Sequence, residues 1–277
     1  MFENGDRRPG LFFIIGPLRT GSSLLTRCID DHPESICLCE SEINRALFPG
    51  YVVLYHSWRM MAHGLKQSEA IGLLDRKKQD DIGSIIKWYS DVVPRLSDLY
   101  GKENVTKLGD KSPDLFRCPE LVRYLSSNFP LIYTVRDPRA IFCSIEYQSN
   151  VSADEKKHRW ESLVQNYLAW KPHLTSPNML ILRYEDLIVD PPMTMEAVYN
   201  HLGLRRSRRF LMPFQRAYPE RFLWATAVDW ETGIRKEFDP NRITSWKTKL
   251  TADQLNCIHS DEIVLEFMER FDYPVDL

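Results

Sequence analysis

Short apolar segments rich in β-branched and aromatic residues alternate along this chain with longer segments of helical periodicity. The predicted strands are Leu11–Ile15, Ser35–Cys39, Asn104–Leu108, Leu131–Val135 and Met179–Arg183. The predicted helices are Ser22–Asp31, Gly83–Tyr100, Pro119–Asn128, Pro138–Tyr147, His158–Lys171, Met193–Leu202 and Asp261–Phe271. Strands that alternate with helices usually pair in parallel and are covered by helices on both faces. The pattern therefore predicts an α/β fold, a three-layer sandwich around a central, mostly parallel sheet.

Two segments depart from this alternation: Tyr51–Asp81, which is less regular and is expected to be helical with loops, and the segment from Arg205 onward, which is basic and aromatic. Neither contains a convincing linker or repeat, so we expect one domain over residues 1–277 with its α/β core at 11–204. The 36 basic and 38 acidic side chains give a net charge of −2, which does not favour a general nucleic-acid or membrane-surface partner. An anion-binding site must be built locally.

No apolar segment approaches the roughly 20 residues of a membrane span, and Leu11–Ile15 is too short for a signal peptide. The closest pair of cysteines, Cys37 and Cys39, lacks the two-residue gap of a zinc or redox motif. We therefore expect a cytoplasmic protein with reduced, mostly buried cysteines and no metal.

Polar or charged residues follow every predicted strand, and the carboxyl ends of parallel strands meet at one edge of the sheet, where ligands bind. These residues are 17–23 after the first strand, Glu40 after the second, Asp110 and Lys111 after the third, Arg136 and Asp137 after the fourth, and 184–186 after the fifth. Five such endings predict a binding site at this edge.

The segment Gly16–Ser23 follows a strand and opens a helix, as an anion-binding loop does. It resembles the Walker A pattern, except that Ser22 stands where that pattern has lysine. Arg19 supplies a cation inside the loop, with a planar fork suited to phosphate or sulfate oxygens. The loop therefore predicts an anion site that is not built for a triphosphate. The alternative is a plain strand-to-helix turn with glycines for geometry.

A second anion clamp is predicted around Arg136, where Pro138 suits the start of a helix. Ser144 lies about two turns further along, on a face that can look back towards Arg136. An arginine and a serine aimed at one point can hold an anion. On its own, the sequence Arg-Asp-Pro more often marks a salt bridge at a helix N-terminus.

Together these two segments resemble the PAPS-dependent sulfotransferase family, whose donor is 3'-phosphoadenosine 5'-phosphosulfate (PAPS). The resemblance rests on Pro17–Leu25, on Arg136–Ala140 with Ser144, and, in chain order, on Gly109–Pro113, Arg183–Leu187, Leu202–Leu204 and Ser245–Lys247. It implies a P-loop-like α/β fold with an acceptor side and a nucleotide cover formed by residues 51–101 and 205–250. It also implies donor contacts from Arg19, Thr20, Gly21, Ser22, Ser23, Arg136, Ser144, Tyr184, Ser245 and Lys247.

Within the family, the loop and the segment Asp31–Glu34 are most similar to the tyrosylprotein sulfotransferase branch. That branch implies a glutamate base at the end of the second strand, which by spacing is Glu40. Because no membrane anchor is visible here, the resemblance favours a soluble bacterial enzyme that sulfates a hydroxyl or a nitrogen of a small, natural-product-like acceptor.

The resemblance assigns four catalytic roles without a metal. Arg19 and the loop hold the 5'-phosphosulfate, Lys111 and Ser245 offset charge on the bridging oxygen, and Glu40 accepts the proton. Arg136, Ser144 and Lys247 bind the 3'-phosphate.

Alternatives stay open for several of these residues. Glu40 could be a solvated strand end, and Glu42 and His32 are rival bases, although a histidine in Asp-His-Pro is more often a structural residue at a helix C-terminus. Lys111 could form a salt bridge with Asp110 instead. Arg205, Arg206, Arg208 and Arg209 could form a solvated turn or an electrostatic funnel for the donor. Tyr218, Phe222, Trp224 and Trp230 could line the acceptor pocket or simply pack. The rival functions are a small-molecule kinase and a non-catalytic nucleotide-binding protein.

Overall fold

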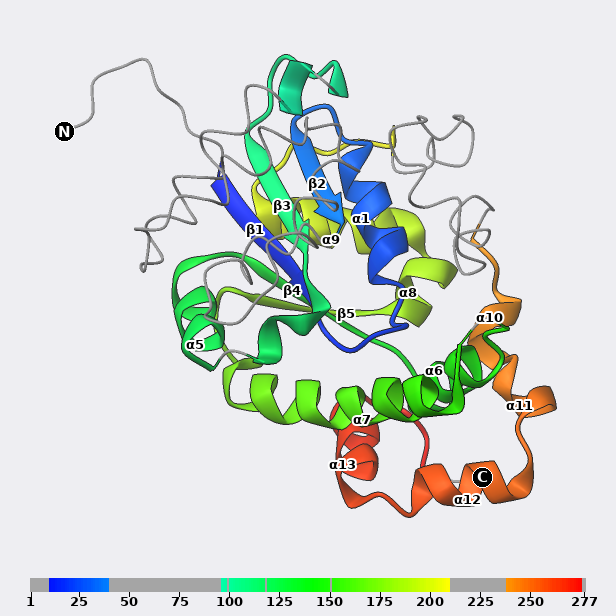
Figure 1. Cartoon of the computed structure of the whole chain (residues 1–277). Helices are drawn as coiled ribbons and strands as arrows, with labels where there is room; N and C mark the ends of the chain where they lie inside the picture. The colour runs from blue at the N-terminus through cyan, green and yellow to red at the C-terminus, as the bar shows by residue number, and fades with distance from the viewer. Residues whose placement is uncertain are drawn as a thin grey trace.

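A computed structural model of the protein describes residues 10–39, 96–98, 100–117, 119–149, 151–209 and 238–275. These residues contain a sheet of five strands, all paired in parallel, in the order β2-β3-β1-β4-β5 (Figure 1). The strands are β1 (Gly10–Ile15), β2 (Ser35–Cys39), β3 (Lys107–Lys111), β4 (Leu131–Val135) and β5 (Met179–Arg183). Their carboxyl ends therefore lie along one edge, as predicted.

Helices cover both faces of this sheet (Figure 1). The described residues include the helices α1 (Ser22–Asp30), α5 (Pro119–Asn128), α6 (Pro138–Glu146), α7 (Ala153–Trp170), α8 (Tyr184–Val189), α9 (Pro191–Leu202), α10 (Asn241–Thr244), α11 (Trp246–Lys249), α12 (Ala252–His259) and α13 (Glu262–Arg270), with short 3₁₀ turns η2 (Pro113–Arg117) and η3 (Lys171–His173). Of these, α10, α11 and α12 lie away from the sheet (Figure 1). The predicted α/β fold with a parallel sheet between helical layers is confirmed.

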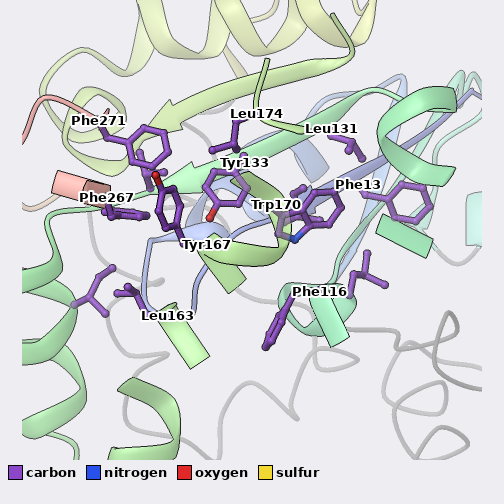
Figure 2. Close-up of a cluster of buried hydrophobic side chains, with 14 of the residues drawn as sticks. Phe13, Phe116, Leu131, Tyr133, Leu163, Tyr167, Trp170, Leu174, Phe267 and Phe271 are labelled. Atoms are coloured by element: carbon purple, nitrogen blue, oxygen red, sulfur yellow. The ribbon is translucent and has the colours of Figure 1, made fainter. Parts of the chain in front are cut away.

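The central strand β1 separates two hydrophobic cores, because successive side chains of a strand point to opposite faces. Leu11, Phe13 and Ile15 pack in the larger core with α5, α6, α7 and α13, whereas Phe12 and Ile14 pack in the smaller core with α1, α8 and α9. Figure 2 shows the aromatic part of the larger core, in which Tyr133 of β4 lies near Tyr167 and Trp170 of α7. A strand buried on both faces explains why β1 reads as a continuous apolar run.

The third strand differs from its prediction: it runs over Lys107–Lys111 instead of Asn104–Leu108. The predicted strand stopped before Gly109, Asp110 and Lys111, because a glycine and two charged residues are not typical of a strand. A Cβ on Gly109 would lie 2.1 Å from Cζ of Phe12, so glycine is required where the ring of β1 crosses β3. Asp110 and Lys111 are buried within the strand, at its carboxyl end, instead of beyond it.

Most predicted helix bounds lie within one residue of the structure, but two helices begin earlier than predicted. The helix predicted at His158 begins at Ala153, because Ser152 caps it by accepting a hydrogen bond from the Glu155 amide at 3.2 Å. The helix predicted at Met193 begins at Pro191, after a similar cap. The short helices α8, α10, α11 and α12 were not predicted. The predicted helix Gly83–Tyr100 lies largely outside the described residues.

Candidate active site

The loop between β1 and α1 is held in a fixed conformation by glycines and by threonine hydroxyls. Gly16 has φ 124°, and a Cβ there would lie 2.4 Å from the Thr134 carbonyl oxygen. The Thr20 hydroxyl donates to the Pro17 carbonyl at 2.9 Å and lies 2.7 Å from the Thr134 hydroxyl. Arg19 adopts φ 70°, a left-handed conformation that is uncommon for a side chain other than glycine. The loop is thus anchored to β4 by its own backbone and hydroxyls.

The loop ends at Gly21, which caps α1 without a side-chain hydrogen bond to the first turn. The first amides of a helix have no partner within the helix and attract anions. Ser22 is buried and its carbonyl accepts a hydrogen bond from Thr26, whereas Ser23 is half-buried. This helix start therefore retains backbone donors that a bound anion can use.

Arg19 and Ser144, which are 125 residues apart in sequence, meet at this edge of the sheet. Nε of Arg19 donates to Oγ of Ser144 at 3.0 Å. The Arg19 carbonyl accepts a hydrogen bond from Nη1 of Arg136 at 3.1 Å. The two predicted anion clamps therefore form one cluster.

Burial, together with the positive charges of Arg136, Arg159 and Arg242, lowers the pKa of the Arg19 guanidinium to about 10, and burial is the largest cause. These four arginines come from the loop, the end of β4, α7 and α10. Like charges that lie close together in a partly buried site repel each other. An anion bound among them would relieve that repulsion.

Arg136 has neutral hydrogen-bond acceptors. Its Nη2 donates to the Arg242 carbonyl at 2.7 Å, and its Cζ lies 4.3 Å from the centre of the Tyr184 ring. Its Nε is buried and has no hydrogen-bond partner among the described residues. Tyr184 in turn packs against Gly21, where a Cβ would lie 2.3 Å from its Cδ2. Tyr184 thus connects the loop to the second clamp.

Lys111 is 3% exposed and lies at the end of β3, opposite Ile14 of β1 and Cys39 of β2. Asp110 beside it is fully buried and accepts a hydrogen bond from the Ser112 hydroxyl at 2.9 Å. Lys111 is therefore held at the carboxyl edge of the sheet, as the last residue of β3. Glu40, which follows Cys39, lies outside the described residues, as does Glu42.

The C-terminal candidates lie against α6. Ser245 lies close to the buried thiol of Cys143, the neighbour of Ser144, and burial raises the pKa of that thiol. Lys247 is exposed, with Nζ 5.7 Å from the centre of the Trp246 ring. Ser245 is thereby placed beside the second clamp. Among the described residues, Lys247 contacts neither Arg136 nor Ser144.

His32 has an internal structural role. The Glu34 amide donates to its Nδ1 at 3.1 Å, so the neutral ring donates from Nε2 to the Arg205 carbonyl at 2.9 Å. The ring is 1% exposed, which leaves neither nitrogen for a substrate proton. The arginines that follow are solvent-facing: Arg205 pairs with Glu34, Arg206 pairs with Glu196, and Arg208 and Arg209 are exposed. Tyr218, Phe222, Trp224 and Trp230 lie outside the described residues.

Within the described residues, no group of three His, Cys, Asp or Glu side chains is placed to hold a metal ion. In the same part of the chain, no helix has the length and apolarity to cross a membrane.

A family model described as "Sulfotransferase family" matches residues 9–208, well over half of the chain. This chain belongs to the sulfotransferase family. The predicted resemblance and the predicted enzyme class are thereby confirmed, and the kinase alternative loses its support. A search of curated proteins found no match for this sulfotransferase.

Solved structures show the same fold. A sulfotransferase domain of the Synechococcus PCC 7002 olefin synthase is similar with a TM-score of 0.62 and 18% identity, covering 100% of this chain and 99% of that one. A sulfotransferase domain of the curacin biosynthetic pathway gives 0.60 and 19%, covering 97% and 99%. A mouse sulfotransferase in complex with PAP gives 0.55 and 15%, covering 95% and 86%.

Sequence reasoning missed several residues that shape this sulfotransferase site. Thr134 anchors the loop, and the Arg242 carbonyl receives Arg136. Glu185 was expected at this edge but without a role; it accepts hydrogen bonds from the Asp137 amide at 3.1 Å and from the Tyr273 hydroxyl at 2.9 Å. The acidic first turn of α8 was a signal for a helix start directly after β5. A backbone carbonyl such as that of Arg242 carries no sequence signal at all.

Proposed function

We propose that this sulfotransferase uses PAPS as its donor and transfers the sulfuryl group to a hydroxyl, or to an amine or amide nitrogen, of a small-molecule acceptor. The observation that carries the proposal is the cluster of Arg19, Ser144 and Arg136 at the start of α1. It joins a site for one anion at the loop to a site for a second anion at α6. PAPS has two such groups, a 5'-phosphosulfate and a 3'-phosphate.

In this mechanism the loop amides and Arg19 hold the 5'-phosphosulfate in line with the acceptor, as in phosphoryl transfer. The acceptor atom forms a bond to sulfur while the bond from sulfur to the bridging oxygen breaks. PAP leaves with the electron pair, and Lys111 and Ser245 offset the charge that develops there. Glu40 accepts the acceptor proton, which contributes about 10²–10⁴-fold to the rate.

Arg136, Ser144 and Lys247 bind the 3'-phosphate, and Tyr184 orients the nucleotide. Arg136 supports this role because it contacts two carbonyls and a ring, and no carboxylate among the described residues neutralises its charge. Lys111 supports its role through its position at the carboxyl edge of the sheet. No metal is needed in this scheme, because side-chain cations balance the charge.

The acceptor is a natural-product-like small molecule. Support comes from the two similar domains, which belong to an olefin synthase and to the curacin pathway. We further propose that residues 1–277 act as one domain in the cytoplasm, with residues 51–101 and 205–250 on the acceptor side and over the nucleotide. The cysteines in the described residues, Cys28, Cys37, Cys39, Cys143 and Cys257, are free thiols, as a reducing compartment favours.

The test is ligand binding by thermal shift and calorimetry, with PAP, ADP and magnesium–ATP compared. A ligand at a hundred times its Kd stabilises by about 2.7 kcal/mol, which raises Tm by roughly 5–10 °C. We expect PAP to stabilise and ADP to do so far less. Stabilisation by magnesium–ATP with no contribution from the 3'-phosphate would instead point to a kinase.

Two variants assign the roles. Ser144→Ala removes a hydrogen bond to a charged group, so we expect PAP affinity to fall about 10- to 100-fold while ADP affinity is unchanged. Glu40→Gln should lower kcat at least about 100-fold with PAP affinity intact. Full turnover in Glu40→Gln would remove Glu40 as the base, and PAP binding without any turnover in the wild type would indicate a non-catalytic binder.

A further inference from the structure

Trp246 lies between Ser245 and Lys247, the two candidate donor residues of the C-terminal segment. It is 9% exposed, whereas the residues on either side are half-buried and exposed. The helices α10 and α11 around it are four residues each. Helices this short do not hold themselves in water, so their position is set by tertiary contacts. What fixes Trp246 therefore fixes Ser245 and Lys247.

Arg139 of α6 supplies the contact. Its Cζ lies 4.1 Å from the centre of the Trp246 ring, and its side chain is 3% exposed. Three residues earlier, Nη2 of Arg136 holds the Arg242 carbonyl of α10 at 2.7 Å. The two arginines of this motif thus contact the two short helices of the C-terminal segment: Arg136 donates to a carbonyl of α10, and Arg139 stacks on the aromatic ring of α11.

The Arg139 guanidinium is oriented by a carboxylate. Nε lies 3.0 Å from Oδ1 of Asp137, and Nη2 lies 2.8 Å from Oδ2. Asp137 also caps α6 by accepting the Arg139 amide at 2.9 Å, and its own amide donates to Glu185. Glu185 accepts a second hydrogen bond from the Tyr273 hydroxyl. This chain of contacts runs from Trp246 to Tyr273, both in the C-terminal part of the protein. The Asp137 carboxylate that orients Arg139 is therefore itself held in place.

These contacts exclude a donor-binding role for Arg139, although it lies in the same motif as Arg136. Its Nε and Nη2 are bonded to Asp137 and one face is covered by Trp246. An arginine buried in this way offers no surface to a phosphate. Its charge instead stabilises the contacts with Asp137 and Trp246 inside the protein.

We propose that Arg139 and Trp246 are positioning residues, which hold Ser245 and Lys247 over the donor site; this inference rests on the proposed function. The contact between Arg139 and the Trp246 ring holds α11 against α6, and the planar guanidinium fixes the orientation of that ring. Lysine lacks the flat face and the two-pronged pairing, so it does not replace arginine here.

The test compares Trp246→Leu with Trp246→Phe, because neither leaves a buried charge unpaired as Arg139→Met would. Each is made in the wild type and in a Ser245→Ala/Lys247→Ala background, and the Kd of PAP is measured by calorimetry. A buried cation–π contact can change an equilibrium about tenfold or more. We expect Trp246→Leu to weaken PAP binding about tenfold in the wild type, and Trp246→Phe to weaken it less than about threefold.

In the Ser245→Ala/Lys247→Ala background the residues to be positioned are gone, so Trp246→Leu should then weaken PAP binding by less than about threefold. An equal loss in both backgrounds would overturn the proposal, because a general loss of structure acts regardless of Ser245 and Lys247. Unchanged PAP binding in Trp246→Leu would also overturn it. Arg139→Lys gives a second, independent variant with the same expected dependence on background.

The matched control is Arg117→Met, since Arg117 also stacks on a ring, that of Phe116 at 4.9 Å, and also pairs with a nearby carboxylate, that of Asp114 at 3.4 Å. It should leave the Kd of PAP unchanged. If the wild-type protein does not bind PAP, the proposed function itself fails; if it does and the Trp246 variants behave as wild type, only the positioning role fails.

Discussion

Substituting Gly21 by alanine would test how the anion loop is joined to Arg136. Gly21 has φ 80°, in the left-handed region that disfavours a Cβ. The added Cβ would also lie 2.3 Å from Cδ2 and 2.8 Å from Cε2 of Tyr184. Gly21→Ala thus combines a backbone cost with a steric one, and the ring that must move is the one against which Arg136 stacks at 4.3 Å.

The two costs can be separated in magnitude. The left-handed conformation costs about 1–2 kcal/mol, and forcing a side chain into a packed site costs about 1–3 kcal/mol. We therefore expect Gly21→Ala to lower the free energy of unfolding in urea by about 2–5 kcal/mol. Gly101→Ala is the matched control, because Gly101 has φ 62° and its Cβ would meet nothing within 4 Å. That variant should lose only about 1–2 kcal/mol.

The functional consequence is measured as PAP affinity in the same variants. A displaced Tyr184 ring should move Arg136 and weaken PAP binding, whereas Gly101→Ala should leave PAP binding unchanged. In a Tyr184→Ala background the overlapping atoms are absent, so the cost of Gly21→Ala should fall to that of the control. An undiminished cost in that background would refute the reasoning, because the ring would then not be the obstacle.

Two further substitutions test the sheet and the histidine at its edge. Gly109→Ala should lower the free energy of unfolding in urea by about 3 kcal/mol, because its Cβ would lie 2.1 Å from Cζ of Phe12, and adding Phe12→Leu should recover part of the loss. An additive loss in that pair would contradict the contact. Burial lowers the pKa of His32, so the folded state favours the neutral ring. The neutral His32 ring therefore contributes its full stability above the unfolded pKa of about 6.5, and that stability is lost as the pH falls below this value. We expect His32→Gln to flatten the decline in stability between about pH 7.5 and about pH 5.5, with His158→Gln, on an exposed ring, as the control.

The parallel pairing of the sheet was predictable because it follows from the alternation of short apolar runs with helical segments. Apolar runs such as Leu131–Val135 and Met179–Arg183 were predicted with the bounds that the structure has, and parallel pairing then brings their carboxyl ends together. That is why the loop after β1 and the residues after β4 could be expected near one another, although Ser144 was expected to face Arg136 and instead accepts a hydrogen bond from Arg19. The prediction needed only the strand ends and one helix start.

Contacts that depend on tertiary packing could not be predicted in this way. The third strand was displaced because the need for Gly109 arises from the Phe12 ring of another strand. The short helices α10 and α11 have no periodic pattern, since four residues make barely one turn. For His32 the sequence favoured a structural role over that of a rival base, but it could not identify the partners, which are backbone groups of Glu34 and Arg205.

The contrast between Arg136 and Arg139 shows what the structure adds to the motif. Both belong to Arg-Asp-Pro-Arg, both are buried, and both stack on an aromatic ring. Arg139 is neutralised by a two-pronged contact with Asp137, while Arg136 is satisfied only by carbonyl oxygens and keeps one buried Nε without a partner among the described residues. A cation held by neutral acceptors keeps its charge for a ligand, because those acceptors fix its geometry without cancelling its field. Arg136, just after β4, is thus suited to an anion, whereas Arg139, in the first turn of α6, is suited to hold the C-terminal segment. The Asp137 carboxylate, which pairs with Arg139, separates the two roles.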